Sequence, residues 1–562
     1  MNQLGGFPLL TLIVFLPGLG AILAAFVPAS RKDTVRWLAL LIAAAAFFTS
    51  LFLYMGWITN PDIDMQFVDG PWDWVPRLGI RYHMGVDGAN LHLIMLTTLM
   101  TPLVLLWPQE VKAKVVYTLF LETGILGALS AMNLVLFVAF LLLSLLSMFF
   151  LIDRDARSVA APAMSRSAAG FLIRTAVVAS LLLAVVAGIL VLSSSLDPTL
   201  PGDFLPGWSA QAWLFWGIVL AMGVVAVAFP FHLGYPQLVD RLSPATHLLL
   251  NGLLINLGGY GLIRFCLTLF PLATTSFAPA LVLIGAIGVV YGALGALGAD
   301  SWSKTLGYWN VAQTGLMVVG IFVLQDLGLH GAIAYLVGRG LSVIALVILS
   351  NKGARPDRPI TRIAAALALL SAVGLPALAG FPGQSMLVQG LLRWHWQVSA
   401  TAVTNTLLDW IFYAAVLIGL AVAAAALFRG WHKHTTGPAG PDAVSSRETW
   451  IAVPVLVVAL IFGLFSYRFS DTIGPTAFLL LTEVDLGTQR TLQQMSPPQD
   501  LDQPPPKTEG EKTSWIAGLD SIVFLDLSVK PGQPDVGPAD FLSNRSFGYV
   551  VPKGEYASLS AS

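Results

Sequence analysis

NLVLFVAFLLLSLLSMFFLI, residues 133–152, contains no charged side chain. An α-helix rises about 1.5 Å per residue, so a stretch of about 20 apolar residues crosses the hydrocarbon core of a bilayer. Comparable blocks recur along the chain, and they lack the alternation of barrel strands. They predict an all-α polytopic membrane protein of about fourteen transmembrane helices, at 7–28, 35–57, 89–107, 115–131, 133–152, 170–194, 210–230, 246–269, 277–299, 305–324, 329–350, 362–392, 407–429 and 450–470.

The composition supports the bilayer as the main environment of the chain. Hydrophobic residues make up 56% and charged residues 11%, against about 25% charged in soluble proteins. The net charge of −1 argues against a nucleic-acid partner. Cys266 is the single cysteine, which excludes an intrachain disulfide and a cysteine-ligated metal centre. The glycine-rich stretch 285–298 lies inside an apolar block, so it predicts close helix packing, not a dinucleotide site.

Positive charges alternate between the loops that join the predicted helices. The opposite loops hold only Arg77, Arg81 and Arg393, with Arg264 and Arg468 in nearby helix ends. By the positive-inside rule, the rich loops are cytoplasmic and both termini face the exterior of a bacterial-type cytoplasmic membrane. The rich loops carry Arg31, Lys32, Arg36, Lys112, Lys114, Arg154, Arg157, Arg166, Arg174, Arg241, Lys304, Lys352, Arg355, Arg358, Arg362, Lys433 and Arg447.

Two regions depart from plain apolar helices. The block 362–392 contains Pro376 and Pro382 beside glycines, which predicts a helix broken within the membrane. From Thr488 to Ser562 the sequence turns polar and proline-rich, which predicts an extramembrane tail with one strand at 521–529.

Several ordered segments carry a resemblance to a known family. They are GVDG at 85–88, PFH at 230–232, SPA at 243–245, LGGYGLIRF at 257–265 and GLPALAGFPG at 374–383. Together they resemble the antiporter-like membrane subunits of respiratory complex I, closest to the subunit M or chain 4 type, which are proton-conducting membrane transporters. The resemblance implies two inverted five-helix repeats with broken helices 7 and 12. The implied division is 1–114 for helices 1–3, 115–269 and 277–429 for the repeats, 450–470 for helix 14 and 488–562 for the tail.

The resemblance also implies a row of ionisable side chains along the membrane centre, because protons cross hydrocarbon only on groups that bind and release them. The family has acids on helices 5 and 12, lysines on helices 7 and 8, and histidines on helices 10 and 11. Aliphatic and amide side chains do not titrate in the useful range, so we expect an interrupted proton path. The matching positions here are Leu142, Gln384, Val225, Asn256, Gln313 and Arg339, in that order.

Five ionisable residues remain candidates for a residual ion path: Glu122, His232, His247, Lys304 and Arg339. Each has a structural alternative. Glu122 can be a buried neutral acid, and the histidines can be structural hydrogen-bonding groups. Arg339 can pair with an acid of this or a neighbouring subunit, such as Asp326, repel cations in the vacated path, or snorkel to an interface. Asp87 is expected to cap the third helix.

These observations predict a membrane-arm subunit of a complex I-like NADH or ferredoxin:quinone oxidoreductase, a divergent paralogue that is structural or non-pumping. Such a chain binds neighbouring membrane subunits and has neither a cofactor nor an active site of its own. The alternatives are a membrane subunit of an inorganic-carbon accumulation complex, or of a multisubunit cation/proton antiporter.

Overall fold

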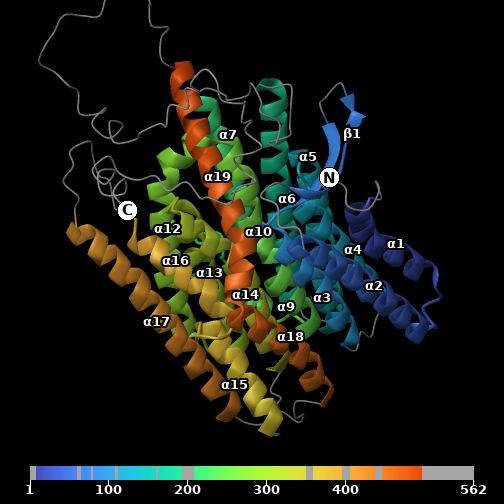
Figure 1. Cartoon of the computed structure of the whole chain (residues 1–562). Helices are drawn as coiled ribbons and strands as arrows, with labels where there is room; N and C mark the ends of the chain where they lie inside the picture. The colour runs from blue at the N-terminus through green and yellow to red at the C-terminus, as the bar shows by residue number, and fades with distance from the viewer. Residues whose placement is uncertain are drawn as a thin grey trace, which may run out of the picture. The chain divides into compact units, whose positions relative to one another are not determined.

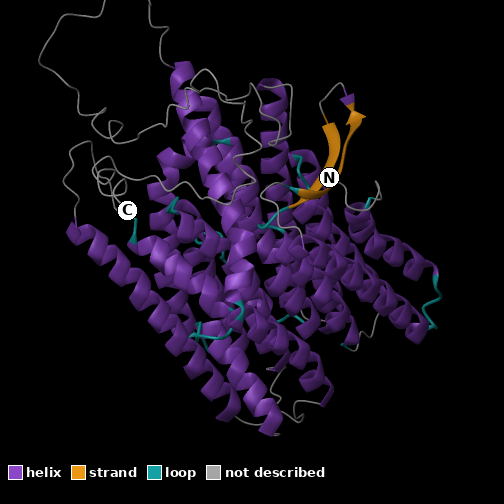
Figure 2. Ribbon diagram, in the orientation of Figure 1, coloured by secondary structure: helices purple, strands orange, loops and turns teal. Residues whose placement is uncertain are grey.

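The structure, a computed structural model, describes residues 8–59, 65–76, 80–107, 112–159, 162–192, 208–349, 359–394, 406–436 and 446–495. These residues are overwhelmingly helical (Figures 1 and 2). The first half contains α1 (Leu9–Phe26), α2 (Lys32–Thr59), β1 (Gln66–Val75), β2 (Ile80–Val86), α3 (Leu91–Leu106), α4 (Lys112–Ser130), α5 (Leu134–Val159), α6 (Pro162–Leu192), α7 (Trp208–Val225) and α8 (Tyr235–Val239). The second contains α9 (Pro244–Leu249), η2 (Leu250–Leu254), α10 (Ile255–Gly261), η3 (Leu262–Cys266), α11 (Leu267–Leu269), α12 (Pro271–Gly298), α13 (Trp302–Phe322), α14 (Asp326–Leu349), α15 (Pro359–Val373), α16 (Gly380–Leu392), α17 (Thr406–Thr436), α18 (Ser446–Leu464) and α19 (Ser466–Met495).

Nine helices of the described part are long and apolar enough to cross a membrane, and the bent pair α18–α19 would make a tenth. Three shorter apolar helices lie within α3, α7 and α15. Every predicted block has a helical counterpart in the structure. The multi-pass architecture is therefore established, while the count of about fourteen crossings stays a prediction.

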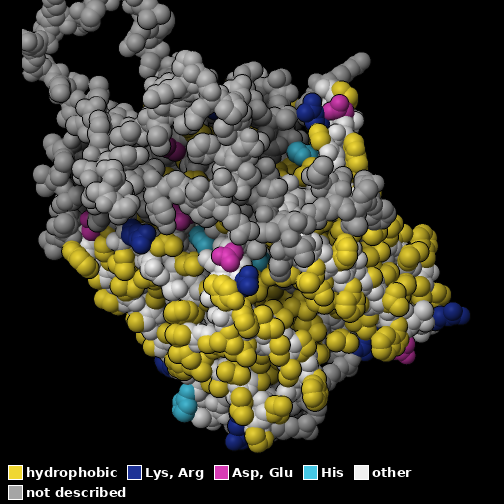
Figure 3. Space-filling model, viewed as in Figure 1, with side chains coloured by type: hydrophobic (Ala, Val, Ile, Leu, Met, Phe, Trp, Pro, Cys, Tyr) yellow, Lys and Arg dark blue, Asp and Glu magenta, His cyan; other side chains and the backbone are white. Residues whose placement is uncertain are grey.

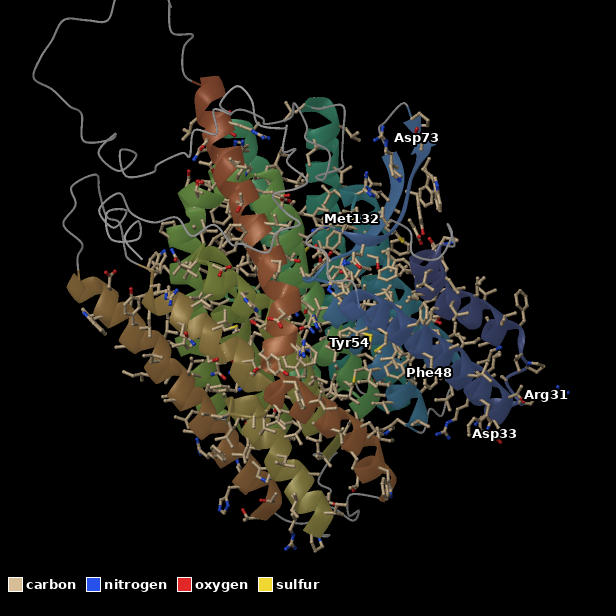
Figure 4. The ribbon with its side chains drawn as sticks, in the orientation of Figure 1. Arg31, Asp33, Phe48, Tyr54, Asp73 and Met132 are labelled. Carbon is tan, nitrogen blue, oxygen red and sulfur yellow. The ribbon has the colours of Figure 1, made fainter. Side chains whose placement is uncertain are left out.

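A β-hairpin between α2 and α3 was not predicted. β1 pairs with β2 in antiparallel register, with three irregularities along the ladder. Thr11 at the start of α1 holds the hairpin: its hydroxyl donates to Asp69 Oδ2 at 2.7 Å and lies 2.7 Å from the Tyr82 hydroxyl. The hairpin tip at Asp73 lies at the opposite end of α1 and α2 from Arg31 (Figure 4). The purely helical expectation is thus wrong here, because the aromatic residues of 72–82 favour strands.

The C-terminal part of the bundle also differs from the prediction. α19 runs from Ser466 to Met495, so residues 488–495 are helical and not part of a proline-rich tail. It meets α18 at a bend of 71° and contacts α14, α12, α11 and α18. Apolar residues are spaced along one face of an otherwise polar helix, and a continuous hydropathy window misses that pattern. Residues 496–562, with the predicted strand at 521–529, lie outside the described residues.

Two helices are interrupted inside the bundle. α7 stops at Val225 and α8 starts at Tyr235, with Val227 in the left-handed region at φ 57°. α15 stops at Val373 and α16 starts at Gly380, with Gly374 at φ 85° and Ala377 at φ 71°. The second interruption falls in the block where Pro376 predicts one. Irregular backbone at this depth must have its polar groups satisfied by protein or water.

Burial separates central helices from lipid-facing ones. The apolar window of α14 is wholly buried and that of Pro244–Leu269 is 89% buried, against 28% for α6 and 33% for α17. The exposed faces are apolar, and Figure 3 shows a broad hydrophobic surface with charged side chains at its margins. α12 packs tightly on α13, where a Cβ on Gly292 would lie 2.3 Å from Ala312 N. This contact confirms that the glycine-rich stretch serves helix packing.

Candidate functional site

The candidate site is a cluster of polar side chains around Arg339, on the most buried helix of the bundle. Arg339 is 1% exposed. Its Nη1 donates to Asn310 Oδ1 of α13 at 2.8 Å, and its Nη2 donates to Asn256 Oδ1 of α10. The Asn310 amide in turn donates to the Tyr235 hydroxyl at 3.0 Å and to Asn251 Oδ1. The guanidinium of α14 is therefore held directly by α13 and α10, and Asn310 extends the network to α8 and η2.

Helix geometry explains why these side chains converge. Tyr335 and Arg339 are four residues apart on α14, and Asn310 and Gln313 are three apart on α13, so each pair shares a face. The Tyr335 hydroxyl donates to Gln313 Oε1 at 2.5 Å. Asn251 lies in the π-helical segment η2, whose wider turn brings it toward the face that carries Asn256 of α10. π-bulges of this kind occur often at functional sites.

Arg339 has no acidic counterpart among the residues that the structure describes. Its Nε also lacks a hydrogen-bond partner there. Asp326 lies thirteen residues away on the same helix, which is about 20 Å along the axis, so the proposed ion pair is wrong. The snorkelling alternative is also wrong, because the side chain is buried. The repulsion of cations in the vacated path stays a prediction, and these contacts are compatible with it.

Gln384 and Ser342 extend the neutral polar lining toward the second helix interruption. Ser342 of α14 and Ser371 of α15 share a hydrogen bond of 2.8 Å between their hydroxyls. Gln384 lies near the start of α16, and its buried Oε1 has no partner within the described chain. A Cβ on Gly374 would lie 2.1 Å from that oxygen, so only glycine fits this turn.

The positions matched to the family's helix 5 acid and helix 7 lysine are apolar in the structure too. Leu142 is half-buried on α5, and Val225 is the last residue of α7. Val225 lines a cavity of about 30 Å³ with Leu145, Leu254, Tyr235 and other residues. That volume holds about two waters, but the aliphatic walls around Val225 offer them few hydrogen bonds.

Three of the candidates for a residual ion path are Glu122, His232 and His247. Glu122 lies on α4 and is 1% exposed, and neither of its carboxyl oxygens has a hydrogen-bond partner within the described residues. His232 lies in the turn between α7 and α8, where its ring contacts Phe229 and Tyr291, and both ring nitrogens are unpartnered among the described residues. His247 is buried on α9, one turn before Asn251. None of the three side chains contacts Arg339 among the described residues, although the main-chain oxygen of His247 accepts a hydrogen bond of 3.2 Å from Asn251 Nδ2 of the cluster.

Lys304 lies apart from the cluster, in the first turn of α13. Its Nζ is 2.8 Å from Asp300 Oδ1 and 3.0 Å from Oδ2. This hydrogen bond lowers the pKa of the Asp300 carboxyl. The pair is solvent-exposed on the Asp300 side, where such ion pairs stabilise little. The structure thus places Lys304 at a helix end.

Asp87 has a larger role than the predicted cap. Its Oδ1 accepts from Ala89 N at 2.9 Å and Asn90 N at 3.1 Å, which confirms a capping function before α3. Its Oδ2 accepts from Arg264 Nη1 at 2.8 Å, in an ion pair whose side chains are 5% and 6% exposed. Asp87 therefore fixes both the start of α3 and the π-helical segment η3.

Sequence reasoning missed Tyr235, Asn251, Asn310 and Tyr335. The amides carry a recognisable signal, because polar side chains inside apolar membrane blocks are rare and tend to face the bundle interior. Their grouping depends on the π turn and on the contacts of α8, α13 and α14, which spacing within one helix does not reveal.

The chemistry of the cluster follows from its groups. Arginine keeps its proton in proteins and the amides do not titrate. The cluster can hold a fixed positive charge, but it offers no side chain that binds and releases a proton at neutral pH. A second unit charge 4 Å away would be repelled by about 4 kcal/mol at an effective dielectric of 20.

Comparisons with known proteins agree with this architecture. Residues 131–409 match the family described as NADH:quinone oxidoreductase/Mrp antiporter, TM. The chain is 25% identical over 574 residues to NADH-quinone oxidoreductase subunit M of Mycobacterium tuberculosis strain H37Rv, covering 90% of this chain and 98% of that protein. It is 31% identical over 441 residues to NAD(P)H-quinone oxidoreductase chain 4 3 of Picosynechococcus sp., covering 73% of this chain and 76% of the relative.

Solved structures show the same fold at lower identity. A chain of respiratory complex I from Thermus thermophilus with bound NADH aligns with a TM-score of 0.73 at 21% identity, covering 84% of this chain and 99% of that chain. A chain of the Mrp complex from Dietzia sp. DQ12-45-1b aligns with a TM-score of 0.70 at 17% identity, covering 86% and 99%. The chain therefore belongs to the family of antiporter-like membrane subunits found in NADH:quinone oxidoreductases of the subunit M or chain 4 type and in Mrp antiporters.

Proposed function

We propose that this chain is a membrane-arm subunit of a complex I-like NADH or ferredoxin:quinone oxidoreductase. The named relatives are subunits M and chains 4 of such enzymes, and the alignment to them covers most of this chain. The described residues contain no group of three or more histidine, cysteine or acidic side chains arranged to hold a metal ion. In this proposal, electron transfer takes place elsewhere in the complex.

The finer part of the proposal is that this subunit does not conduct protons along the family's usual route. The observation that carries it is the Arg339 cluster, where a buried guanidinium is held by the amides of Asn310 and Asn256. A relay needs groups that alternate between protonation states, and a fixed cation also raises the barrier for an arriving proton. The chain would then serve to bind neighbours and to seal the membrane.

Isolating the native complex from membranes and identifying its subunits tests the assembly. We expect other membrane-arm subunits and the redox subunits of a quinone oxidoreductase to copurify. A chain that runs alone through purification would contradict the proposal. A large soluble zinc protein as the main partner would favour the inorganic-carbon alternative, and Mrp-type subunits would favour the antiporter alternative.

A paired substitution tests the interrupted route. Arg339→Met with Asn310→Leu removes the buried charge together with one of its two amide acceptors, and Asn256 keeps the hydrogen bond from its Nδ2 to the Gly252 main-chain oxygen. We expect the ratio of protons pumped to electrons transferred to stay within about 20% of the wild-type value. A fall below half, with electron transfer preserved, would show that protons pass through this cluster.

A further inference from the structure

A second arginine, Arg174 of α6, has an environment that the proposed function does not use. Its guanidinium donates to the main-chain oxygen of Leu233, in the turn between α7 and α8. Among the described residues no carboxylate forms an ion pair with it. The cation is thus half-buried at a helix interruption, with the Leu233 carbonyl as its hydrogen-bond partner among the described residues.

The surface beside Arg174 is strongly apolar and exposed. Leu172, Ile173 and Val177 of α6 are 42%, 64% and 44% exposed, and Leu233 is 69% exposed. Only 28% of the apolar window of α6 is buried. This part of α6 therefore presents aliphatic side chains to the acyl chains of a bilayer, immediately next to a cation.

Below Arg174 lies the cavity of about 30 Å³ described above, which Phe171, Arg174, Thr175 and Val178 line from α6. The cavity is too small for an acyl chain, so a lipid would lie over its mouth. Its wall joins α6 to both sides of the α7–α8 interruption, through Val225 and Tyr235. A molecule bound at Arg174 would therefore brace the interrupted helix.

More positive charge lies toward the start of α6. Arg166 is exposed, and Arg241 donates to Ser167 Oγ at 3.2 Å. Arg166 lies eight residues before Arg174, about 12 Å along the helix. Helical side chains tilt toward the N-terminus, so the Arg174 stem reaches toward this end. Asp240, the adjacent acid, accepts a hydrogen bond from Ser301 Oγ at 2.5 Å.

The depth of Arg174 suits a lipid headgroup. α6 has 31 residues, about 46 Å of helix against a hydrocarbon core of about 30 Å. Arg174 is twelve residues, about 18 Å, from the start of α6. With the excess length at that end, its side chain, tilted toward the N-terminus, reaches the edge of the headgroup layer. Arginines between helices, with apolar surface beneath them, are a recognised setting for anionic headgroups.

We propose that Arg174 binds the phosphodiester of an anionic phospholipid, in the crevice between α6 and the α7–α8 turn, with Arg166 and Arg241 adding long-range attraction. The acyl chains lie along Ile173, Val177 and Leu233. This site does not depend on whether the subunit conducts protons.

The test uses the full chain, purified in neutral detergent, and thermal unfolding with added phosphatidylglycerol, phosphatidylcholine or inorganic phosphate. We expect phosphatidylglycerol to raise the melting temperature by several degrees, and phosphatidylcholine or phosphate to raise it by less than a third as much. Arg174→Gln should lose at least half of the phosphatidylglycerol shift. Arg429→Gln is the matched control, because Arg429 also donates to a main-chain oxygen, that of Leu297, from an exposed position. This variant should keep the full shift.

Equal shifts in Arg174→Gln and wild type would overturn the proposal, as would equal shifts from phosphatidylcholine. A full shift from phosphate alone would identify a simple anion site and not a lipid site. Native mass spectrometry of the wild type gives a second readout that needs no variant. We expect at least one phosphatidylglycerol retained in preference to phosphatidylcholine, and no preference would reject the site.

Discussion

Arg339 and its amide partners decide what the centre of this chain can do. A guanidinium offers five N–H donors and no acceptor, and here it donates to Asn310 and Asn256. Burial of an ion costs several kcal/mol unless other groups compensate it. The amides Asn310 and Asn256 partly supply that compensation without supplying a titratable group. The proposed function rests on this charge staying fixed.

Part of this cluster could be predicted from the sequence. The oddness of Arg339 and the neutral character of Gln313 and Asn256 were visible in the sequence. The choice between repulsion, pairing and snorkelling was not, because it depends on which helices surround α14. The roles of Tyr235 and Asn310 depend on contacts between residues 75 positions apart, and single-sequence patterns do not encode such contacts.

The buried pair Asp87–Arg264 gives a prediction about stability. Asp87→Asn should lower the free energy of unfolding by about 3–5 kcal/mol, because Arg264 remains buried without its acid. Combining Asp87→Asn with Arg264→Met should restore much of that loss. Chemical denaturation of the purified chain measures both values. Losses that simply add in the double variant would contradict a coupled pair.

Tyr82 of the hairpin gives a prediction about pH. Burial, chiefly, raises the pKa of its hydroxyl to about 12, with Asp69 contributing in the same direction and the Thr11 hydrogen bond opposing it. A raised pKa means that the folded state holds the proton more tightly than the unfolded state. The stabilisation is complete below about pH 10 and is lost as the pH rises toward 12. The difference in ultraviolet absorbance between the wild type and Tyr82→Phe, followed as the pH is raised, should show a transition near pH 12. A transition near pH 10 would contradict the burial of this hydroxyl.

Among the elements, α19 is the one that binds distant parts of the bundle together. Gly88 N donates to Thr476 Oγ1 at 3.0 Å, and Ser470 Oγ lies 3.1 Å from His330 Nε2 of α14. Gln211 Nε2 of α7 donates to Thr491 Oγ1 at 3.3 Å. The helix was missed because its polar residues make these contacts, so its sequence does not form a continuous apolar block. The break between α15 and α16, by contrast, was predicted from Pro376 and Pro382 beside glycines, whereas the break after α7 was implied only by the family resemblance.

A substitution at Gly88 tests how α19 packs against the start of α3. A Cβ at this position would lie 1.9 Å from the Thr472 main-chain oxygen, so Gly88→Ala must displace α19 or α3. We expect a loss of about 1–3 kcal/mol, typical of overpacking, and faster proteolysis within 466–495. Gly170→Ala is the control, because nothing lies within 4 Å of a Cβ there. Equal stability of the two variants would show that α19 is not seated by this contact.

At the scale of the whole molecule, the fold is that of a family whose members lie in respiratory and antiporter complexes. The membrane class and the family were readable from block lengths and ordered motifs, since both depend on local sequence. The hairpin and α19 were not readable, because short strands and amphipathic helices lack a hydropathy signal of comparable strength. We propose that the chain keeps the family fold while the centre of its helix bundle carries the fixed positive charge of Arg339.

Proton flux through the full chain in liposomes tests that claim most directly. A potassium diffusion potential set by valinomycin supplies the driving force, and an internal pH dye reports the flux. We predict a wild-type rate within about twofold of protein-free liposomes, a difference below about 0.4 kcal/mol in barrier at RT of 0.59 kcal/mol. A wild-type rate at least tenfold above that background, and reduced by the Arg339→Met, Asn310→Leu pair, would contradict the account.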